Sequence, residues 1–439
     1  MASSSDDKKI YALINYEDAY VQPLILAALE KRLPPSSYHL ITSLSQLPHP
    51  TSRLLQFLQY EAIDWDHLTA HPSSSLANAY IIRKALIRKH YLSTTIANWV
   101  TKYPDSVLAQ HVKPSVEFEV DYAEFLDDAL VEAWELRASW ERNAELEGSG
   151  EEEVKKGREW WILKPGMSER GQGIRLFSNE EELTGIFEEW DPESSDDEDG
   201  DDEEGGGTRS DGADGKEDKA EKDGIITSQL RHFIAQPYIH PPLLLSPPQA
   251  DTATTTPTSL RKFHIRTYVL ATGALKVFVY RPMLALFAAK PYLPPWHAAL
   301  QENRDEAMRA HLTNTCLQDT GDREGSVGLF WDLPDELPTQ PYSSSSSSPA
   351  TTTTSGTDWK SAVFQEIQDV TAATFEAAAR GMSIHFQALP NAFEVFGLDY
   401  MVSVEEQGGG LKTWLLEVNA FPDFRQTGGG VEGVGGGVV

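Results

Sequence analysis

Residues 414–419 read Trp-Leu-Leu-Glu-Val-Asn, and this run decides how the rest of the chain is interpreted. Its composition is typical of a buried strand, and a period of two places the side chains of Glu417 and Asn419 on the same face. A carboxylate beside a carboxamide offers oxygen ligands to a hard cation such as Mg²⁺, which usually also takes phosphate oxygens from a nucleotide. The alternative is an amphipathic strand with polar residues in water, and the flanking Trp, Leu and Val argue against it.

A second acid lies in another apolar run of strand length, because residues 396–402 read Phe-Gly-Leu-Asp-Tyr-Met-Val. The acid of this run is Asp399. Burying Asp399, Glu417 and Asn419 is costly unless some partner compensates their polar groups. The sequence therefore predicts two strands that together carry three oxygen ligands for a metal ion.

Composition limits the class of protein. The chain has 439 residues, of which 40% are hydrophobic and 10% aromatic, and this length predicts two or three lobes with a sizeable core. Its one cysteine, Cys316, excludes an intrachain disulfide and favours a reducing compartment. The polar residues 1–9 lack the apolar core of a signal peptide, and no run approaches the roughly 20 apolar residues that span a bilayer. We therefore expect a cytoplasmic protein with no membrane partner.

The formal net charge is −30, and much of it is local. Residues 191–223 hold 16 acids and 4 bases in a Gly-rich, low-complexity stretch, so a net −12 comes from this segment alone. Such a run is typical of a solvated, disordered insertion. The negative field argues against direct nucleic-acid binding, which needs the opposite charge.

Hydrophobic periodicity predicts a small α/β N-terminal domain followed by a larger α+β part. A strand at 10–14 and a helix at 21–33 mark the first of these. A helical period then covers 76–99, with Ile82, Leu86 and Ile96 as inward positions, and a second, acidic helical stretch covers 123–147. Further strands are expected at 160–164, 173–177, 233–236, 265–270 and 275–280, before the two strands that carry the acids.

Three low-complexity segments interrupt this pattern, at 191–224, 246–259 and 337–357. They are too polar to pack and too long for ordinary connections, so we expect them to be loops inserted between strands of one domain. The Gly-rich tail at 426–439 is expected to be disordered.

Basic and glycine-rich motifs lie upstream of the acids. Lys164 ends a predicted strand and is followed by a Gly-rich loop at 166–173; the glycines let a backbone approach phosphates, and the lysine adds a point charge. The loop is not a Walker A motif, because no Gly-Lys-Ser/Thr closes it and no helix follows, and an ordinary turn is the alternative. Further on, Lys262, His264 and Arg266 alternate along one predicted strand. Three basic groups on one face are favourable only opposite anions.

Taken in order, these motifs resemble the tubulin–tyrosine ligase family of ATP-grasp enzymes. They are Leu-Lys-Pro at 163–165, Gly-Gln-Gly at 171–173, Gln-Pro-Tyr-Ile at 236–239, Arg-Lys-Phe-His-Ile-Arg at 261–266, Tyr-Arg at 280–281, His-Leu-Thr-Asn-Thr at 311–315, Phe-Gly-Leu-Asp at 396–399 and Leu-Glu-Val-Asn at 416–419. The resemblance covers residues 76–425. It implies an α+β ATP-grasp fold, with lobes at about 76–260 and 261–425 that clasp ATP, preceded by a small α/β domain at 1–75.

The resemblance also implies an activity, the ATP-dependent ligation of an amino acid to a protein carboxylate through an acyl phosphate. Arg266, Arg281 and Lys262 would be the catalytic residues, with the arginines holding the carboxylate or acyl-phosphate end of the substrate. Mg²⁺ would be bound by Asp399, Glu417 and Asn419. The residues implied in ATP binding are Lys164, Gly171, Gly173, Gln236, Pro237, Tyr238, Ile239, Lys262, His264 and Asn314.

Two of these positions depart from the family pattern. Relatives often have Lys at the place of Pro237, and a hinge that uses only the carbonyl group there tolerates proline. Tubulin ligases usually have Asp at the place of His264. An imidazole cannot replace a carboxylate that accepts hydrogen bonds from ribose or an incoming amine. We therefore expect nucleotide binding to survive this change and the transfer of the usual amino acid to be impaired by it.

Three functions remain open from the sequence. The first is ligation of an amino acid, with tyrosine as the first candidate, to a tubulin tail or another protein C-terminus; the basic residues 83–90 could receive an acidic tail, or could form a solvated helix face. The second is a Mg-ATP-binding scaffold without turnover, since fungal family members with similar motifs at 83–92 and 261–266 associate with mRNA processing bodies. The third is glutamylation or glycylation, which needs a different amino-acid pocket.

Overall fold

The computed structural model describes residues 9–148, 150, 154, 157–166, 173–190, 230–248, 259–302, 304–313, 326–342, 358–405 and 410–420. Gly171, Asn314, Cys316, residues 191–224 and 426–439, and most of the other two low-complexity segments lie outside these ranges, so the predictions made for them stay untested. The chain divides into two compact units. Unit 1 comprises Met1–Ser115, Glu169–Gly171 and Gln236–Val439, and unit 2 comprises Val116–Ser168 and Gln172–Ala235.

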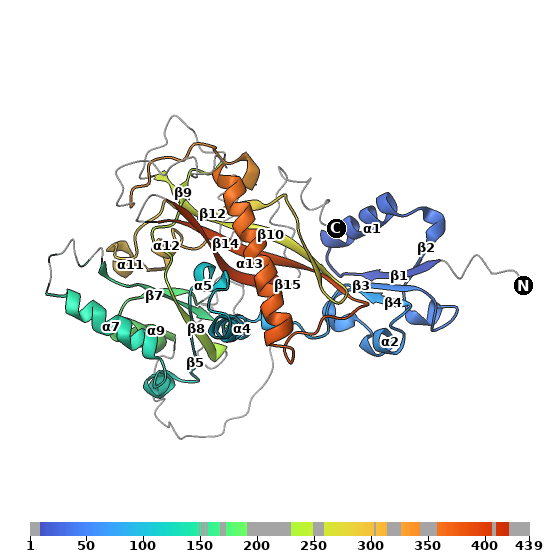
Figure 1. The fold of residues 1–439 in the computed structure, drawn as a ribbon, viewed down its shortest axis with the longest axis horizontal. Coiled ribbons are helices and arrows are strands. Elements are labelled where there is room, and N and C mark those ends of the chain that lie inside the picture. The colour runs from blue at the N-terminus through green and yellow to red at the C-terminus, as the bar shows by residue number, and fades with distance from the viewer. Residues whose placement is uncertain are drawn as a thin grey trace, which may run out of the picture. The chain divides into compact units, whose positions relative to one another are not determined.

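Unit 1 begins with a small parallel sheet in the order β2-β1-β3-β4 (Figure 1). Its elements are β1 Ile10–Asn15, α1 Val21–Arg32, β2 Tyr38–Ile41, β3 Leu54–Leu58, α2 Trp65–Ala70 and β4 Ser75–Ala77. Alternation of buried and half-buried residues along β3 lets Leu54 and Leu58 pack with Tyr11 and Leu68 in one core. The predicted first strand and first helix are therefore confirmed.

The predicted helix at 76–99 is wrong in its first half. Leu76 lies in β4, and the helices of this region are the short α3 Lys84–Ile87 and α4 Lys89–Lys102. Residues 77–82 bond to a distant part of the chain instead: Ala77 N–H donates to the Asn391 carbonyl, and Gln387 N–H donates to that of Ile82. Leu86 and Ile96 are buried as expected, and Ile82 is only half-buried.

The larger sheet of unit 1 has the order β13-β12-β10-β14-β15, with β9 and β11 also paired to β10. Its strands are β9 Leu244–Leu245, β10 Arg261–Thr272, β11 Lys276–Val279, β12 Leu284–Phe287, β13 Val327–Leu329, β14 Phe393–Val404 and β15 Leu411–Ala420. Every pair is antiparallel. The strands predicted around the acids and the basic triplet are confirmed.

One face of this sheet is closed by helices. The long α13 Trp359–Gly381 lies across it, as Figure 1 shows, and begins where Asp358 accepts a hydrogen bond from the Ser361 N–H at 2.7 Å. In the described residues, unit 1 also contains the α-helices α5 Leu108–His111, α11 Ala299–Glu302 and α12 Arg304–Met308. Odd-numbered residues of β10, such as Phe263 and Ile265, join the buried cluster beneath α13. The even-numbered residues therefore point to the opposite face.

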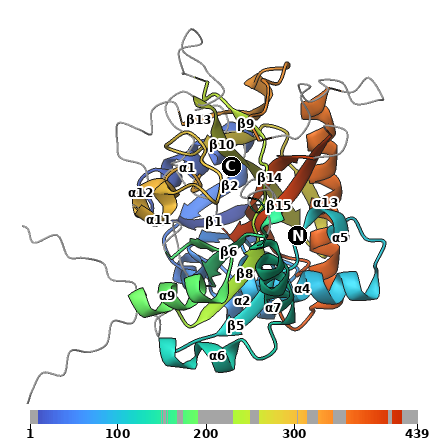
Figure 2. The same cartoon turned by 90° about the vertical axis from the view of Figure 1, so that its left-hand side faces the viewer.

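Unit 2 is a four-stranded sheet in the order β5-β8-β6-β7 with helices packed on it (Figure 2). Its elements are β5 Val116–Glu119, α6 Leu126–Ala129, α7 Trp134–Leu146, β6 Trp161–Pro165, β7 Arg175–Phe177, α9 Glu180–Trp190 and β8 His232–Pro237, which runs into unit 1. The acidic stretch predicted as one helix at 123–147 is broken at 130–133, between α6 and α7. The strand predicted at 173–177 is shorter, because Gly173 takes a positive φ of 72° before it.

Among the described residues, no helix combines the length and the apolar character that a membrane span needs.

Candidate functional site

Three adjacent strands place the predicted catalytic and metal residues side by side. Arg266 on β10 is opposite Asp399 on β14, and Asp399 is in turn opposite Glu417 on β15. Asn419 is opposite Gly397, and it lies two residues after Glu417 on the same face of β15. The pairing of β14 with β15 shifts register beside Asp399, where Leu416 has no partner of its own. The sheet thus brings together residues that are more than 150 positions apart in the sequence, such as Arg266 and Glu417.

Arg266 and Asp399 are joined by a two-point ion pair. Nε of Arg266 donates to Oδ1 of Asp399, and Nη2 donates to Oδ2 at 3.0 Å. The side chain of Asn419 bridges the two acids, because its Nδ2 lies 3.3 Å from Asp399 Oδ2 and 3.1 Å from Glu417 Oε1. Lys89, at the start of α4, lies 3.7 Å from Glu417 Oε2. The two carboxylates are therefore close neighbours with cations on both sides.

Burial and the neighbouring carboxylate decide the charge of Asp399. Its pKa is raised to about 7, mainly because the group is buried, although Arg266 acts in the opposite direction; Glu417 raises it further. The raised pKa means that burial disfavours the ionised form of Asp399, and added positive charge would favour that form. A divalent cation would supply that charge, and the donor set of two carboxylates and one amide oxygen suits Mg²⁺. The residues present therefore fit the predicted metal.

No group of three or more His, Cys, Asp and Glu side chains that could hold a metal occurs in the part of the chain that the structure describes. The predicted Mg²⁺ set contains only two acids, so its third protein ligand would have to be the Asn419 amide oxygen. The amide, whose Nδ2 faces both acids, would have to turn over to present that oxygen. That choice agrees with a cation that keeps several waters or phosphate oxygens in its coordination shell.

His264, the main departure from the family pattern, faces the same group. Its Nε2 lies 3.6 Å from Asp399 Oδ1, and its Nδ1 is 2.6 Å from the Thr313 hydroxyl. Burial, together with the positive charge of Arg266, lowers the pKa of His264 to about 3. The imidazole is therefore neutral at physiological pH and adds no charge to the site.

Lys262 is held by a buried polar network. Its Nζ donates to the Tyr238 hydroxyl at 3.1 Å and lies 4.6 Å from the centre of that ring. The Tyr238 hydroxyl also lies 2.8 Å from Nδ1 of His311, and Tyr292 contributes a further hydrogen bond that lowers the Tyr238 pKa against the larger effect of burial. A lysine fixed at the edge of the Asp399 face is suited to bind an anion.

The predicted hinge at 236–239 is tied down by side chains. Gln236 Nε2 donates to the Lys113 carbonyl at 3.1 Å and to the Ser115 hydroxyl at 3.2 Å. Tyr238 and Ile239 are buried, whereas Pro237 is only half-buried. The role predicted for these residues as an ATP hinge stays a prediction.

Other predicted residues belong to other elements of the fold. Lys164 and Gly173 belong to unit 2, where a Cβ at Gly173 would come within 2.6 Å of Pro165 Cγ, so this position requires glycine. Arg281 is exposed and stacks on Trp331, with its guanidinium carbon 4.5 Å from the ring centre. The catalytic role predicted for Arg281 and the phosphate role of Lys164 stay predictions.

Sequence reasoning missed three contacts of the site. Thr313 and His311 stood out only as part of a polar cluster, and their bonds to His264 and Tyr238 give that cluster its place. Lys89 was part of a basic segment, and its ion pair with Glu417 connects that segment to the acids. The only signal for these contacts was unexplained polarity between apolar runs.

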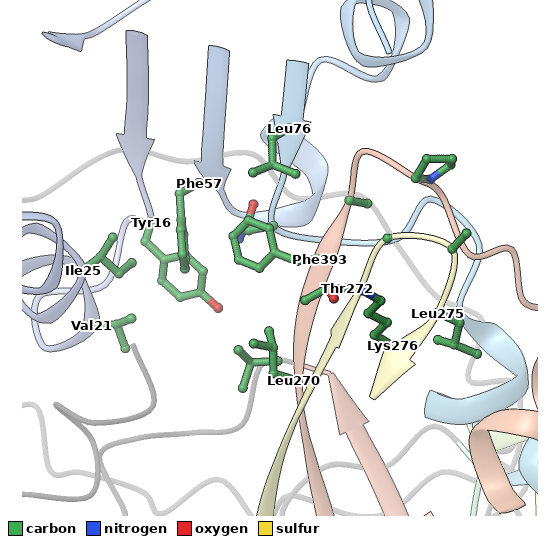
Figure 3. A pocket seen from close by; sticks show the side chains of 16 residues that line it. Tyr16, Val21, Ile25, Phe57, Leu76, Leu270, Thr272, Leu275, Lys276 and Phe393 are labelled. Atoms are coloured by element: carbon green, nitrogen blue, oxygen red, sulfur yellow. The ribbon is translucent and has the colours of Figure 1, made fainter. Parts of the chain in front are cut away.

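A separate apolar pocket of about 700 Å³ lies at the other end of the same sheet face (Figure 3). Leu270, Thr272, Phe393 and Val395 line it from the sheet, and Tyr16 is among the residues that close it from the N-terminal part. Phe393 is opposite Thr272, six residues along β10 from Arg266. Its mainly aliphatic and aromatic walls do not suit a triphosphate, so we do not assign the nucleotide to it.

The chain was compared with known proteins. Residues 86–432 match the model of the tubulin–tyrosine ligase family. A probable tubulin–tyrosine ligase of Schizosaccharomyces pombe is 38% identical over 98% of this chain and 88% of its own length. The probable tubulin–tyrosine ligase PBY1 of Saccharomyces cerevisiae is also 38% identical, over 93% of this chain, which spans about half (48%) of that relative.

A solved structure supports the fold. It is the C-terminal domain of K. lactis Pby1, described as an ATP-grasp enzyme that interacts with the mRNA decapping enzyme Dcp2. That domain is 33% identical to this chain with a TM-score of 0.59, over 98% of this chain and 90% of the domain. The expected ATP-grasp fold is confirmed, with a parallel N-terminal sheet beside antiparallel ones. This chain belongs to the tubulin–tyrosine ligase family.

Proposed function

We propose that this protein is a Mg-ATP-dependent carboxylate–amine ligase that adds an amino acid, with tyrosine as the first candidate, to the C-terminal carboxylate of a protein. The observation that carries the proposal is the constellation on one sheet face: Arg266 against Asp399, with Glu417 and Asn419 beside them. Cytoplasmic location, including processing bodies, is part of the same proposal.

The metal would be held by Asp399, Glu417 and Asn419. When bound, Mg²⁺ neutralises charge on the phosphates and polarises the transferred phosphoryl group. The supporting observation is that Asp399 and Glu417 are opposite each other on adjacent strands, with the Asn419 amide contacting both carboxylates. Lys89 stands 3.7 Å from Glu417 and would limit the freedom of that ligand.

The remaining work falls to the basic side chains. Lys262, fixed by Tyr238, would bind a phosphate of ATP. Arg266 would hold the acceptor carboxylate through the N–H groups of Nη1 and Nη2 that its pairing with Asp399 does not use. A carboxylate oxygen attacks the γ-phosphorus and the bond to ADP breaks, which gives an acyl phosphate. The amine of the incoming amino acid then attacks the acyl carbon, phosphate leaves, and the amine loses a proton as the amide forms.

The acceptor is proposed from chemistry and from the names of relatives. Two relatives are described as probable tubulin–tyrosine ligases, so the acidic tail of tubulin is the first candidate. A chain with a net charge of −30 gains no long-range attraction to such a tail, so local bases such as Lys84 and Arg88 would have to attract it. Other protein C-termini, and glutamate or glycine as the added amino acid, are alternatives.

A second candidate function is a Mg-ATP-binding scaffold without ligase turnover. The neutral His264, which replaces the usual carboxylate, favours it. So does the solved relative described as interacting with a decapping enzyme, since an analogous partner would place this protein in processing bodies. Direct contact with nucleic acid forms no part of either proposal.

One experiment separates the two functions. The protein is incubated with Mg-ATP, labelled tyrosine or glutamate and detyrosinated tubulin, and label transfer is measured beside ATP binding by calorimetry. Transfer by the wild type, lost in Glu417→Gln, is expected for a ligase. ATP binding without label transfer would support the scaffold function and contradict the ligase. Absence of ATP binding would overturn both proposed functions.

His264→Asp is the informative companion variant. An Asp side chain at this position could accept a hydrogen bond from the Thr313 hydroxyl, which now contacts the imidazole. A gain of transfer would show that His264 limits the reaction. Thr101→Ser is a matched control, because its exposed hydroxyl donates to the Ala97 carbonyl within helix α4 and faces none of the site residues described above.

A further inference from the structure

The acidic stretch between β5 and α7 carries an unusual number of exposed aromatic side chains. Of the nine large hydrophobic residues that are exposed in the described part of the chain, four lie within 13 residues: Tyr122, Phe125, Val131 and Trp134. Trp134 is 67% exposed, and the rings of Tyr122 and Phe125 contact each other edge to face with centres 6.2 Å apart. Scattered apolar residues need no explanation, but a local group of this kind marks an interaction site.

These aromatic residues are not needed by the core of unit 2. The same stretch supplies Leu126, Leu130, Ala133 and Leu136 to the interior, each no more than 2% exposed. Other residues of the stretch therefore fill the interior, and the exposed aromatic residues are not part of that core.

Acids surround the aromatic residues. Glu124, Asp127, Asp128, Glu132 and Glu135 are all exposed, and residues 121–136 contain no Lys or Arg. The salt bridges described for unit 2 include none to these five acids; the nearest base in them, Arg231, pairs with Glu119 and Asp121. A purely solvated face would show acids with small polar neighbours, whereas this one alternates carboxylates with rings.

We propose that residues 121–135, here called the acidic aromatic segment, form a docking surface for a basic, arginine-containing segment of a partner protein. The argument is complementarity of charge and of shape. A guanidinium group can stack on an aromatic face and at the same time pair with two carboxylate oxygens, whereas an ammonium group is a point charge without a flat face. A surface that offers both partners within a few residues therefore prefers arginine to lysine.

The test uses fluorescein-labelled peptides of Arg-Gly-Gly repeats and of Lys-Gly-Gly repeats, titrated with the full-length protein at physiological ionic strength and followed by anisotropy. The arginine peptide is expected to bind more tightly. The double variant Phe125→Ala/Trp134→Ala should weaken its binding about tenfold and remove the preference over lysine, with no change in charge. The control Leu40→Ala/Ile384→Ala removes exposed side chains elsewhere (48% and 79% exposed) and should change nothing.

A charge comparison separates this surface from the general acidity of the chain. Asp127→Asn/Asp128→Asn should weaken the arginine peptide more than Glu181→Gln/Glu188→Gln, which removes the same charge from exposed sites on α9 of the same unit. Equal losses in the two charge variants, equal affinity for both peptides, or wild-type binding by the aromatic variant would each overturn the proposal. The proposal would also be overturned if the aromatic variant changed the molecular mass measured by sedimentation but not the peptide binding, because the surface would then bind a second copy of the chain.

Discussion

Arg266 on β10 and Asp399 on β14 form a buried ion pair through two hydrogen bonds between adjacent strands. The side chains of both residues are less than 10% exposed. An ionised carboxylate has about four acceptor positions, so Asp399 keeps capacity for a further partner after it binds the guanidinium group. The pair can therefore stabilise the sheet and still take part in a metal site.

Replacing Asp399 by Asn should destabilise the unligated protein. The amide keeps the shape of the side chain but leaves the charge of Arg266 buried without a counter-ion, which costs about 3–5 kcal/mol in comparable pairs. Equilibrium urea unfolding measures the loss. Glu376→Gln is the control, because its pair with Arg380 is exposed and such pairs contribute about 0–1 kcal/mol. A similar loss in both variants would contradict a special role for the buried pair.

Tyr238→Phe should weaken Mg-ATP binding by about tenfold while adenosine binding stays unchanged. The variant keeps the ring and removes the hydroxyl that accepts the hydrogen bond of Lys262, so the lysine proposed to bind a phosphate loses one of its partners while the ring stays in place. Calorimetry with both ligands measures the difference. Tyr342→Phe serves as control, since the described contacts of Tyr342 are with the rings of His240 and Tyr292. Equal weakening of ATP and adenosine would mean that Tyr238 acts through the hinge instead.

The strands and the residues of the site could be predicted from the sequence because their signals are local. Asp399, Glu417 and Lys262 are polar residues inside apolar runs, and strand periodicity fixes the face on which each lies. The sheet then needs only antiparallel pairing to bring them together, as β10, β14 and β15 do.

What could not be predicted depends on contacts between distant segments. Residues 77–82 have helical periodicity, yet Tyr80 N–H donates to Glu394 at 3.0 Å and Arg83 lies 3.2 Å from the same carboxylate. Partners more than 300 positions away therefore override the local preference for a helix. Arg281 is a second case, because Trp331 and Phe364 give its side chain a stacking surface that no local pattern indicates.

Glu394 should make stability depend on pH. Burial raises its pKa from 4.5 to about 8, against the effects of Arg83 and the Tyr80 N–H. The folded state thus holds the proton more tightly than the unfolded state, and this contribution is complete below about pH 4.5 and is lost as the pH rises to about 8. Relative to Glu394→Gln, the free energy of unfolding of the wild type should therefore fall across this window. Urea unfolding between these limits measures it, and parallel pH profiles would contradict the assignment.

Gln340 lies near the start of the low-complexity segment 337–357, and its side chain is packed into the folded structure. The segment at 337–357 was expected to be too polar to pack, but Leu337 and Gln340 are each only 5% exposed. The Gln340 amide pairs with both backbone groups of Leu244 on β9, accepting from its N–H at 2.9 Å and donating to its carbonyl at 3.1 Å. The side chain thus completes the hydrogen bonding of a two-residue strand.

Gln340→Leu should cost about 2–4 kcal/mol, because it leaves one buried donor and one buried acceptor of Leu244 without partners. Gln340→Glu keeps the acceptor and loses the donor, so its loss should be intermediate when it is measured near neutral pH. Urea unfolding compares both with Gln365→Leu, whose amide bonds only to exposed Asp369 in the same helix among its described contacts. If Gln340→Leu were as stable as this control, β9 would not depend on the amide, and the segment would be as dispensable as its composition predicts.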